Sequence, residues 1–119
     1  MGLLNKDQIL KADDLKSEIV EVPEWGGEVK VRTMTGIERD TFEESIFDNK
    51  GKDTKMNLKN LRAKLVVLTV IGDNGERLFT ESDVDALGKK SAKALDRIFG
   101  VAQTLNGIGQ KEVEELTKN

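Results

Sequence analysis

The acidic side chains are the groups in this sequence with the greatest capacity for catalysis. The chain contains 22 aspartates and glutamates, but no histidine, cysteine or tyrosine. This excludes the commonest general base, the Ser-His and Cys-His nucleophile pairs, and zinc sites built on nitrogen or sulfur. A pair of carboxylates remains able in principle to hydrolyse a glycoside. However, the acids lie mostly in first turns and on polar faces of expected helices, where capping and solvation account for them, so we expect no catalytic site.

Three short segments imitate ligand-binding motifs without meeting their spacing. Residues 48–53 and 73–76 carry acids and glycine, but an EF-hand needs glycine at its sixth position and glutamate at its twelfth. Residues 88–91 (GKKS) end like a P-loop, although no glycine lies five residues earlier and no strand is expected before them. We therefore expect no metal, no cofactor and no enzymatic activity.

Three apolar residues are candidates for contact with a partner: Trp25, Val113 and Leu116. Trp25 follows Pro23 at the tip of an expected hairpin, where an aromatic ring either packs over neighbouring helices or is offered to a partner. Val113 and Leu116 share one face of an expected last helix, 110–118, and are core residues unless that helix is free to dock. Packing is the commoner fate of such residues, and both alternatives stay open.

The composition predicts a soluble protein of one domain, residues 1–119. The apolar fraction is 37% and the charged fraction 34%, with both signs mixed along the chain. The formal net charge of −3 disfavours nucleic acid as a partner, because such binding depends on neutralising phosphates. The longest apolar run, at 65–71, is far too short to span a bilayer, and the first residues lack the pattern of a signal peptide. We expect a cytoplasmic protein with no membrane partner.

The N-terminal third of the chain is predicted to combine a short helix with a β-hairpin. Asn5 and Gln8 form a capping box within the arm 1–16, and the thin apolar content of that helix predicts that it leans on the body or frays. Residues 17–22 and 28–34 flank a linker with one proline and two glycines, and the second run alternates apolar and polar side chains. Segment 17–34 is therefore a predicted hairpin whose apolar face rests on helices.

The remainder, 35–118, is predicted to be helical. Thr35 and Glu38 form a capping box for a helix that ends near Phe47, and a polar, mobile loop at 48–55 follows. The residues expected on one face of that helix are Ile37, Thr41, Phe42, Ser45 and Ile46.

Leucine spacings of three and four predict a buried central helix over 57–70, with a strand over 65–71 as the competing interpretation. Further helices are expected at 80–88, 91–105 and 110–118. The predicted fold class is α+β, a mostly helical single domain in which the hairpin packs against about four to five helices. The expected core comprises Leu61, Leu65, Leu68, Leu95, Ile98 and Phe99.

Several short segments, taken in order, carry a resemblance to a known family. They are 12–16 (ADDLK), 20–27 (VEVPEWGG), 29–40 (VKVRTMTGIERD), 60–63 (NLRA), 75–80 (GERLFT), 83–88 (DVDALG), 94–99 (ALDRIF), 105–107 (LNG) and 113–119 (VEELTKN). The chain resembles the tail-assembly chaperones of long-tailed (siphovirus-like) bacteriophages and prophages. The resemblance covers most of the chain, and its motifs are patterns of fold rather than of chemistry.

The resemblance implies a non-enzymatic function in tail morphogenesis. Such a chaperone binds the long, helical tape-measure protein, keeps it soluble and helps recruit tail-tube subunits. It acts in the cytoplasm of the bacterial host and is not expected in the mature virion; weak self-association is compatible with this role. The alternatives are a minor structural protein retained in the tail and, less favoured, an enzyme with carboxylate catalysis.

Overall fold

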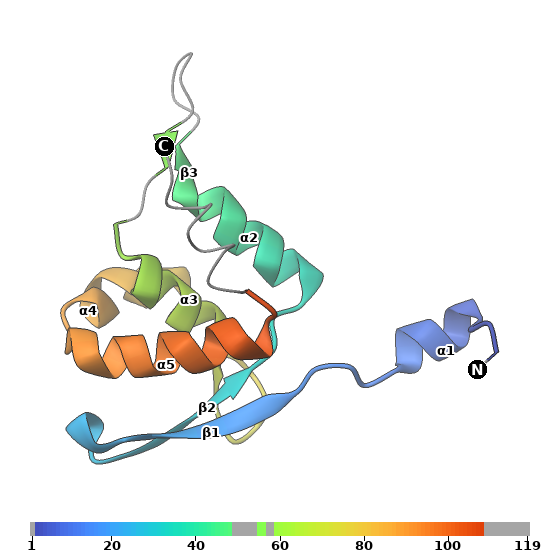
Figure 1. Ribbon diagram of the computed structural model, residues 1–119, viewed down its shortest axis with the longest axis horizontal. Coiled ribbons are helices and arrows are strands. Elements are labelled where there is room, and N and C mark those ends of the chain that lie inside the picture. The colour runs from blue at the N-terminus through green and yellow to red at the C-terminus, as the bar shows by residue number, and fades with distance from the viewer. Residues whose placement is uncertain (1, 49–54, 57–58, 109–119) are drawn as a thin grey trace.

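A three-stranded antiparallel sheet packs against helices, which confirms the predicted α+β class (Figure 1). This computed structural model describes residues 2–48, 55–56 and 59–108. The α-helices of the described part are α1 (Lys6–Lys11), α2 (Gly36–Ile46), α3 (Leu61–Thr69), α4 (Val84–Gly88) and α5 (Ala92–Leu105). The sheet has the order β1-β2-β5 and consists of β1 (Ser17–Val22), β2 (Gly27–Arg32) and β5 (Val70–Ile71).

The β1–β2 hairpin follows the apolar alternation of the sequence. Its buried side chains are Val20, Val22 and Val31. A 3₁₀ turn, η1 (Pro23–Trp25), joins the strands and is closed by Gly26, whose φ of 74° lies in the left-handed region that favours glycine. The hairpin is thus confirmed within the predicted segment 17–34, although β2 ends at Arg32 rather than at the predicted Met34.

The predicted central helix 57–70 corresponds to α3, which begins at Leu61 and ends at Thr69. Val70 has extended backbone angles (φ −80°, ψ 127°) and continues into β5, where it pairs with Val31 of β2. The competing strand interpretation is therefore right for Val70 and Ile71, and the helix prediction is wrong at Val70. These β-branched residues suit a strand once a partner strand is beside them.

The core lies where α3, α5 and the hairpin meet. α5 contacts α3 and also both strands of the hairpin (Figure 1). Six of the nine residues of α3 are buried, which confirms it as the central helix. Among the predicted core residues, Leu65, Leu68, Leu95 and Ile98 are buried, and Leu61 and Phe99 are partly buried against the same cluster.

α2 begins as predicted but presents a different face to the core. The Thr35 amide donates to Glu38 Oε1 at 2.9 Å and the Glu38 amide to Thr35 Oγ1 at 3.2 Å, so the capping box is present. Phe42 and Ile46 are buried, whereas Ile37 is 80% exposed. The prediction that Ile37 shares their face is wrong, because five residues rotate a helix by about 140°.

Two predicted segments fall wholly or partly outside the described residues. The loop predicted at 48–55 begins in β3 (Phe47–Asp48) and ends in β4 (Lys55–Met56), where Asp48 pairs with Lys55, and 49–54 lie outside the described part. The predicted last helix, 110–118, with Val113 and Leu116, also lies outside it.

The helices predicted at 80–88 and 91–105 are confirmed. Thr80 and Asp83 form a capping box that opens a 3₁₀ turn, η2 (Glu81–Asp83), and α4 follows directly. The Ser91 hydroxyl accepts a hydrogen bond from the Ala94 amide at 3.3 Å and so caps α5. A left-handed Gly107, with a φ of 66°, follows the end of α5.

α1 stands apart from the body of the molecule. The Asn5–Gln8 capping box is formed as predicted, with both hydrogen bonds at 2.9 Å. No residue of α1 is buried, and Figure 1 places the helix away from the sheet and the other helices. The expectation that this helix leans on the body is therefore wrong. No helix in the described ranges has both the length and the hydropathy needed to cross a membrane.

Candidate interaction surface

Trp25 lies at the hairpin tip, as the sequence predicted. It is the last residue of the 3₁₀ turn η1, and its side chain is partly buried against the hydrophobic core cluster. Of the two alternatives for Trp25, packing over neighbouring elements therefore accounts for its partial burial, and its contact with a partner stays a prediction. Val113 and Leu116 lie outside the described residues, and their contact with a partner also stays a prediction.

An ion pair fastens the hairpin tip to α5. Arg97 of α5 donates to both carboxylate oxygens of Glu24, from Nη1 to Oε1 at 2.5 Å and from Nη2 to Oε2 at 2.9 Å. Two parallel bonds of this kind fix orientation as well as distance. The turn that carries Trp25 is therefore held against α5 by a contact that joins residues 73 positions apart.

This ion pair predicts a specific pH dependence. The hydrogen bonds from Arg97 lower the pKa of the Glu24 carboxyl from 4.5 to about 2. Because the pKa is lower in the folded protein, the stabilisation is fully present above pH 4.5 and is lost as the pH falls towards about 2. In urea unfolding at a series of pH values, the stability difference between the wild type and Glu24→Gln should shrink across that window.

The partner residue supplies the control for this experiment. In an Arg97→Gln background, the change in unfolding free energy caused by Glu24→Gln should vary little with pH across that window. The reason is that the hydrogen bonds that lower the pKa of Glu24 are gone. A carboxyl carbon of Glu24 that titrates near 4.5 by NMR in the wild type would contradict the prediction.

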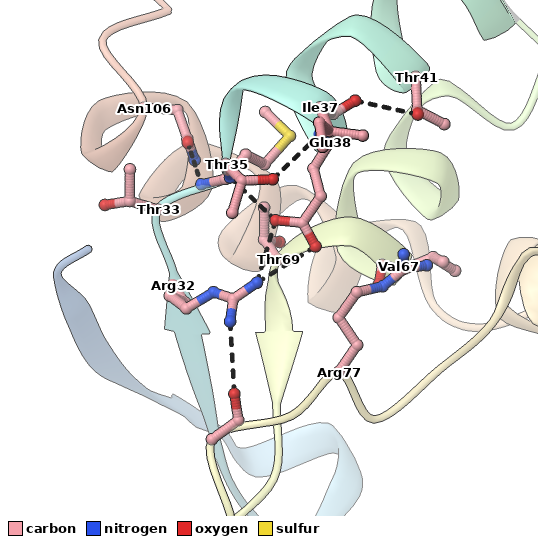
Figure 2. A network of polar contacts seen from close by, with 12 residues as sticks. Arg32, Thr33, Thr35, Ile37, Glu38, Thr41, Val67, Thr69, Arg77 and Asn106 are labelled. Atoms are coloured by element: carbon pink, nitrogen blue, oxygen red, sulfur yellow. Dashed lines mark hydrogen bonds and ion pairs between the residues drawn. The ribbon is translucent and has the colours of Figure 1, made fainter. Parts of the chain in front are cut away.

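A polar junction ties β2, α2 and α5 together (Figure 2). Arg32 Nη2 donates to both oxygens of Glu38 at 3.0 and 3.1 Å, while its Nη1 donates to the Gly75 carbonyl at 3.3 Å. The Met34 amide donates to Asn106 Oδ1 at 2.6 Å. These contacts join side chains of three elements and occupy both terminal nitrogens of Arg32, so the junction holds the elements together.

The N-terminal arm, residues 2–16, carries five of the eight large apolar side chains that are exposed among the described residues. They are Leu3, Leu4, Ile9, Leu10 and Leu15. The two in α1, Ile9 and Leu10, are 56% and 71% exposed. Neither residue stands out in the sequence, because two adjacent apolar residues are too few for an amphipathic stripe. The feature of the sequence that points to their exposure is their position on an arm that precedes the hairpin, apart from other apolar residues.

The comparison with family models decides the identity of the chain. The model described as phage tail assembly chaperone matches residues 6–119. The chain belongs to the phage tail assembly chaperone family. The resemblance inferred from the short segments is thereby confirmed, and the matched range includes α1, the hairpin and all later described elements.

A solved structure supports the same fold for this tail assembly chaperone. The present chain is similar to the chain in "Structure of bacteriophage HK97 tail assembly chaperone", with a TM-score of 0.59 and 20% sequence identity. The match covers 83% of this chain and 94% of that chain. Comparison with curated proteins gives no significant match.

Membership of a chaperone family implies a non-enzymatic role for this protein. The acids do not gather into a metal site in the part of the chain that the structure describes, where no three of them lie together. Surface acids such as Asp96 and Glu81 are instead paired with Arg62 and Arg77. The geometry therefore offers surfaces for binding, among them the arm with its exposed apolar side chains.

Proposed function

We propose that this chain binds the tape-measure protein of a long-tailed phage, keeps it soluble and helps recruit tail-tube subunits. The family match over residues 6–119 carries the proposal. A tape-measure protein is long and largely helical, so before assembly it exposes apolar stripes that would otherwise aggregate. The chaperone acts by binding alone, in the cytoplasm of the host, and leaves before the virion is complete.

The exposed arm supports this role physically. Apolar side chains such as Leu10, 71% exposed, gain free energy by moving from water into contact with an apolar partner. A single arm offers little area, but many copies along one target gain avidity, and weak self-association would add to it. The arm can form these contacts without disturbing the core, because no residue of α1 is buried.

Trp25 and the predicted last helix, 110–118, with Val113 and Leu116, form a second proposed part of the partner surface. Trp25 is partly buried against the core, so replacing it would change both stability and binding. The arm therefore gives the cleaner test.

The arm variant Ile9→Ser/Leu10→Ser should separate binding from folding. We expect the soluble fraction of co-expressed tape-measure protein to fall severalfold, because two of the exposed apolar contacts are removed. The thermal midpoint of the purified chaperone should stay within a few degrees of the wild type, since surface substitutions usually change stability little. Solubility is measured by centrifugation of the co-expression lysate.

Leu78→Ser is the matched control, because Leu78 is 57% exposed but lies on the body, outside the arm. It should leave the solubility of the tape-measure protein unchanged. An arm variant that still solubilises the partner fully would show that the arm is not the contact. If the intact chain neither binds nor solubilises the tape-measure protein and is found in washed particles, it is a minor structural protein of the tail instead.

A further inference from the structure

β1 is an edge strand with one unpaired side. The sheet order is β1-β2-β5, so among the described strands β1 pairs with β2 alone. The Thr33 amide donates to the Lys16 carbonyl at 2.8 Å, and hydrogen-bonded pairs then alternate along the hairpin. The backbone groups of Glu18 and Val20 therefore face β2, whereas those of Ser17, Ile19 and Glu21 face away. No described residue bonds to the amides or carbonyls of Ile19 and Glu21.

A groove of about 540 Å³ runs beside this edge, between β1 and α5. Glu18, Ile19 and Glu21 line it from the strand and Val101 from the helix. A chain segment that paired with the outward groups of β1 would place alternate side chains towards Val101 and towards solvent beside Ile19. The unpaired edge of β1 can thus accept an added β-strand, a common way of binding an extended peptide, with Val101 beside it.

The charges along the edge favour a basic occupant. Glu18 and Glu21 line the groove, and Glu21 lies directly opposite Glu28 across the hairpin. Two like charges in such a pair disfavour each other, and a cation nearby would relieve this. Arg97 also lines the groove, but its guanidinium is bonded to Glu24. Lys30 is also exposed, but it lies opposite Ile19 on the neighbouring strand β2. The charged side chains that β1 itself contributes to the groove, Glu18 and Glu21, are both acidic.

We propose that the free edge of β1 binds an extended partner segment in which basic and apolar side chains alternate. The segment adds a fourth strand to the sheet. Its apolar side chains point towards Val101, on the face of β1 that carries Val20, and its basic side chains lie on the opposite face, beside Glu21 and Glu28. A second copy of β1 would bring another Glu18 and Glu21 to the same edge, so the charges disfavour self-pairing. The inference rests on the proposed function only in that the occupant belongs to a protein that the chaperone escorts.

A synthetic peptide tests this proposal without the tape-measure protein, so its result is independent of the solubility assay. The probe is a capped nonapeptide of alternating lysine and valine, and its affinity for the full chain is measured by fluorescence anisotropy at low ionic strength. Glu21→Lys/Glu28→Lys reverses the charge of the cross-strand pair on the face of the basic side chains and should weaken binding about tenfold or more. The control Asp40→Lys/Glu44→Lys makes the same change in net charge at two exposed residues of α2 and should have little effect.

Backbone pairing needs its own test. Ile19→Pro removes an outward-facing amide at an edge position where proline is tolerated, and it should abolish binding. A probe N-methylated at every second residue should likewise fail to bind the wild-type chain, whatever the effect of Ile19→Pro on folding. Equal weakening by both charge variants, or full binding of the methylated probe, would overturn the proposal. So would a dimer that forms through β1 and is lost in Ile19→Pro.

Discussion

Replacing Leu65 by alanine should lower the free energy of unfolding by about 2–5 kcal/mol. Leu65 is fully buried in α3 and belongs to the cluster that joins α3, α5 and the hairpin. Deleting one methine and two methyl groups there removes transfer free energy and leaves a cavity that rigid neighbours fill only in part. Urea unfolding followed by circular dichroism measures the change.

Leu95→Ala should behave similarly, because Leu95 is 4% exposed and packs in the same cluster from α5. Leu78→Ala makes the same chemical change at a leucine that is 57% exposed, and it should cost well under 1 kcal/mol. Losses below about half a kilocalorie at both Leu65 and Leu95 would show that the core is misplaced.

Arg32→Ala should cost about 2–3 kcal/mol, because it leaves the Glu38 carboxylate without its charged partner. The two side chains are only 18% and 13% exposed, and Arg32 also bonds to the Gly75 carbonyl (Figure 2). Since Glu38 also caps α2 through the Thr35 amide, the loss loosens the start of that helix. The cost lies below the range for fully buried pairs, because water still reaches both groups.

A double-mutant cycle isolates the contribution of this pair. Arg32→Ala and Glu38→Gln should couple by about 1 kcal/mol or more, since the two residues share two hydrogen bonds. Arg62→Ala is the control, because Arg62 and Asp96 are more than half exposed and such pairs contribute little. Equal costs for Arg32→Ala and Arg62→Ala would contradict the structural role of the junction.

The elements that sequence reasoning placed correctly depend on contacts between near neighbours. The capping pairs Asn5–Gln8 and Thr35–Glu38 are each closed within three residues, so composition and spacing suffice to find them. Leucine periodicity likewise located α3. The end of α3 was misjudged at Val70, where pairing with a strand 39 residues earlier decides the outcome.

The candidate site depends on distant contacts and was predicted less completely. Trp25 was correctly placed at the hairpin tip, but its partial burial and the Glu24–Arg97 pair require knowledge of where α5 lies. The exposure of Ile9 and Leu10 could not be inferred, because the same residues would be core if the arm folded back. The free edge of β1 follows only from the strand order, which places β5 on the far side of β2.

The β2–β5 pairing has a consequence for the order in which the chain gains its structure. β1 and β2 are joined by a short turn, so their hairpin can close early, within microseconds. β5 must find β2 across about 40 residues, and the Arg97–Glu24 contact spans 73, so closing these loops costs more entropy. During synthesis the hairpin therefore leaves the ribosome well before α5 can cover it, and until then Val20, Val22 and Val31 remain open to other chains.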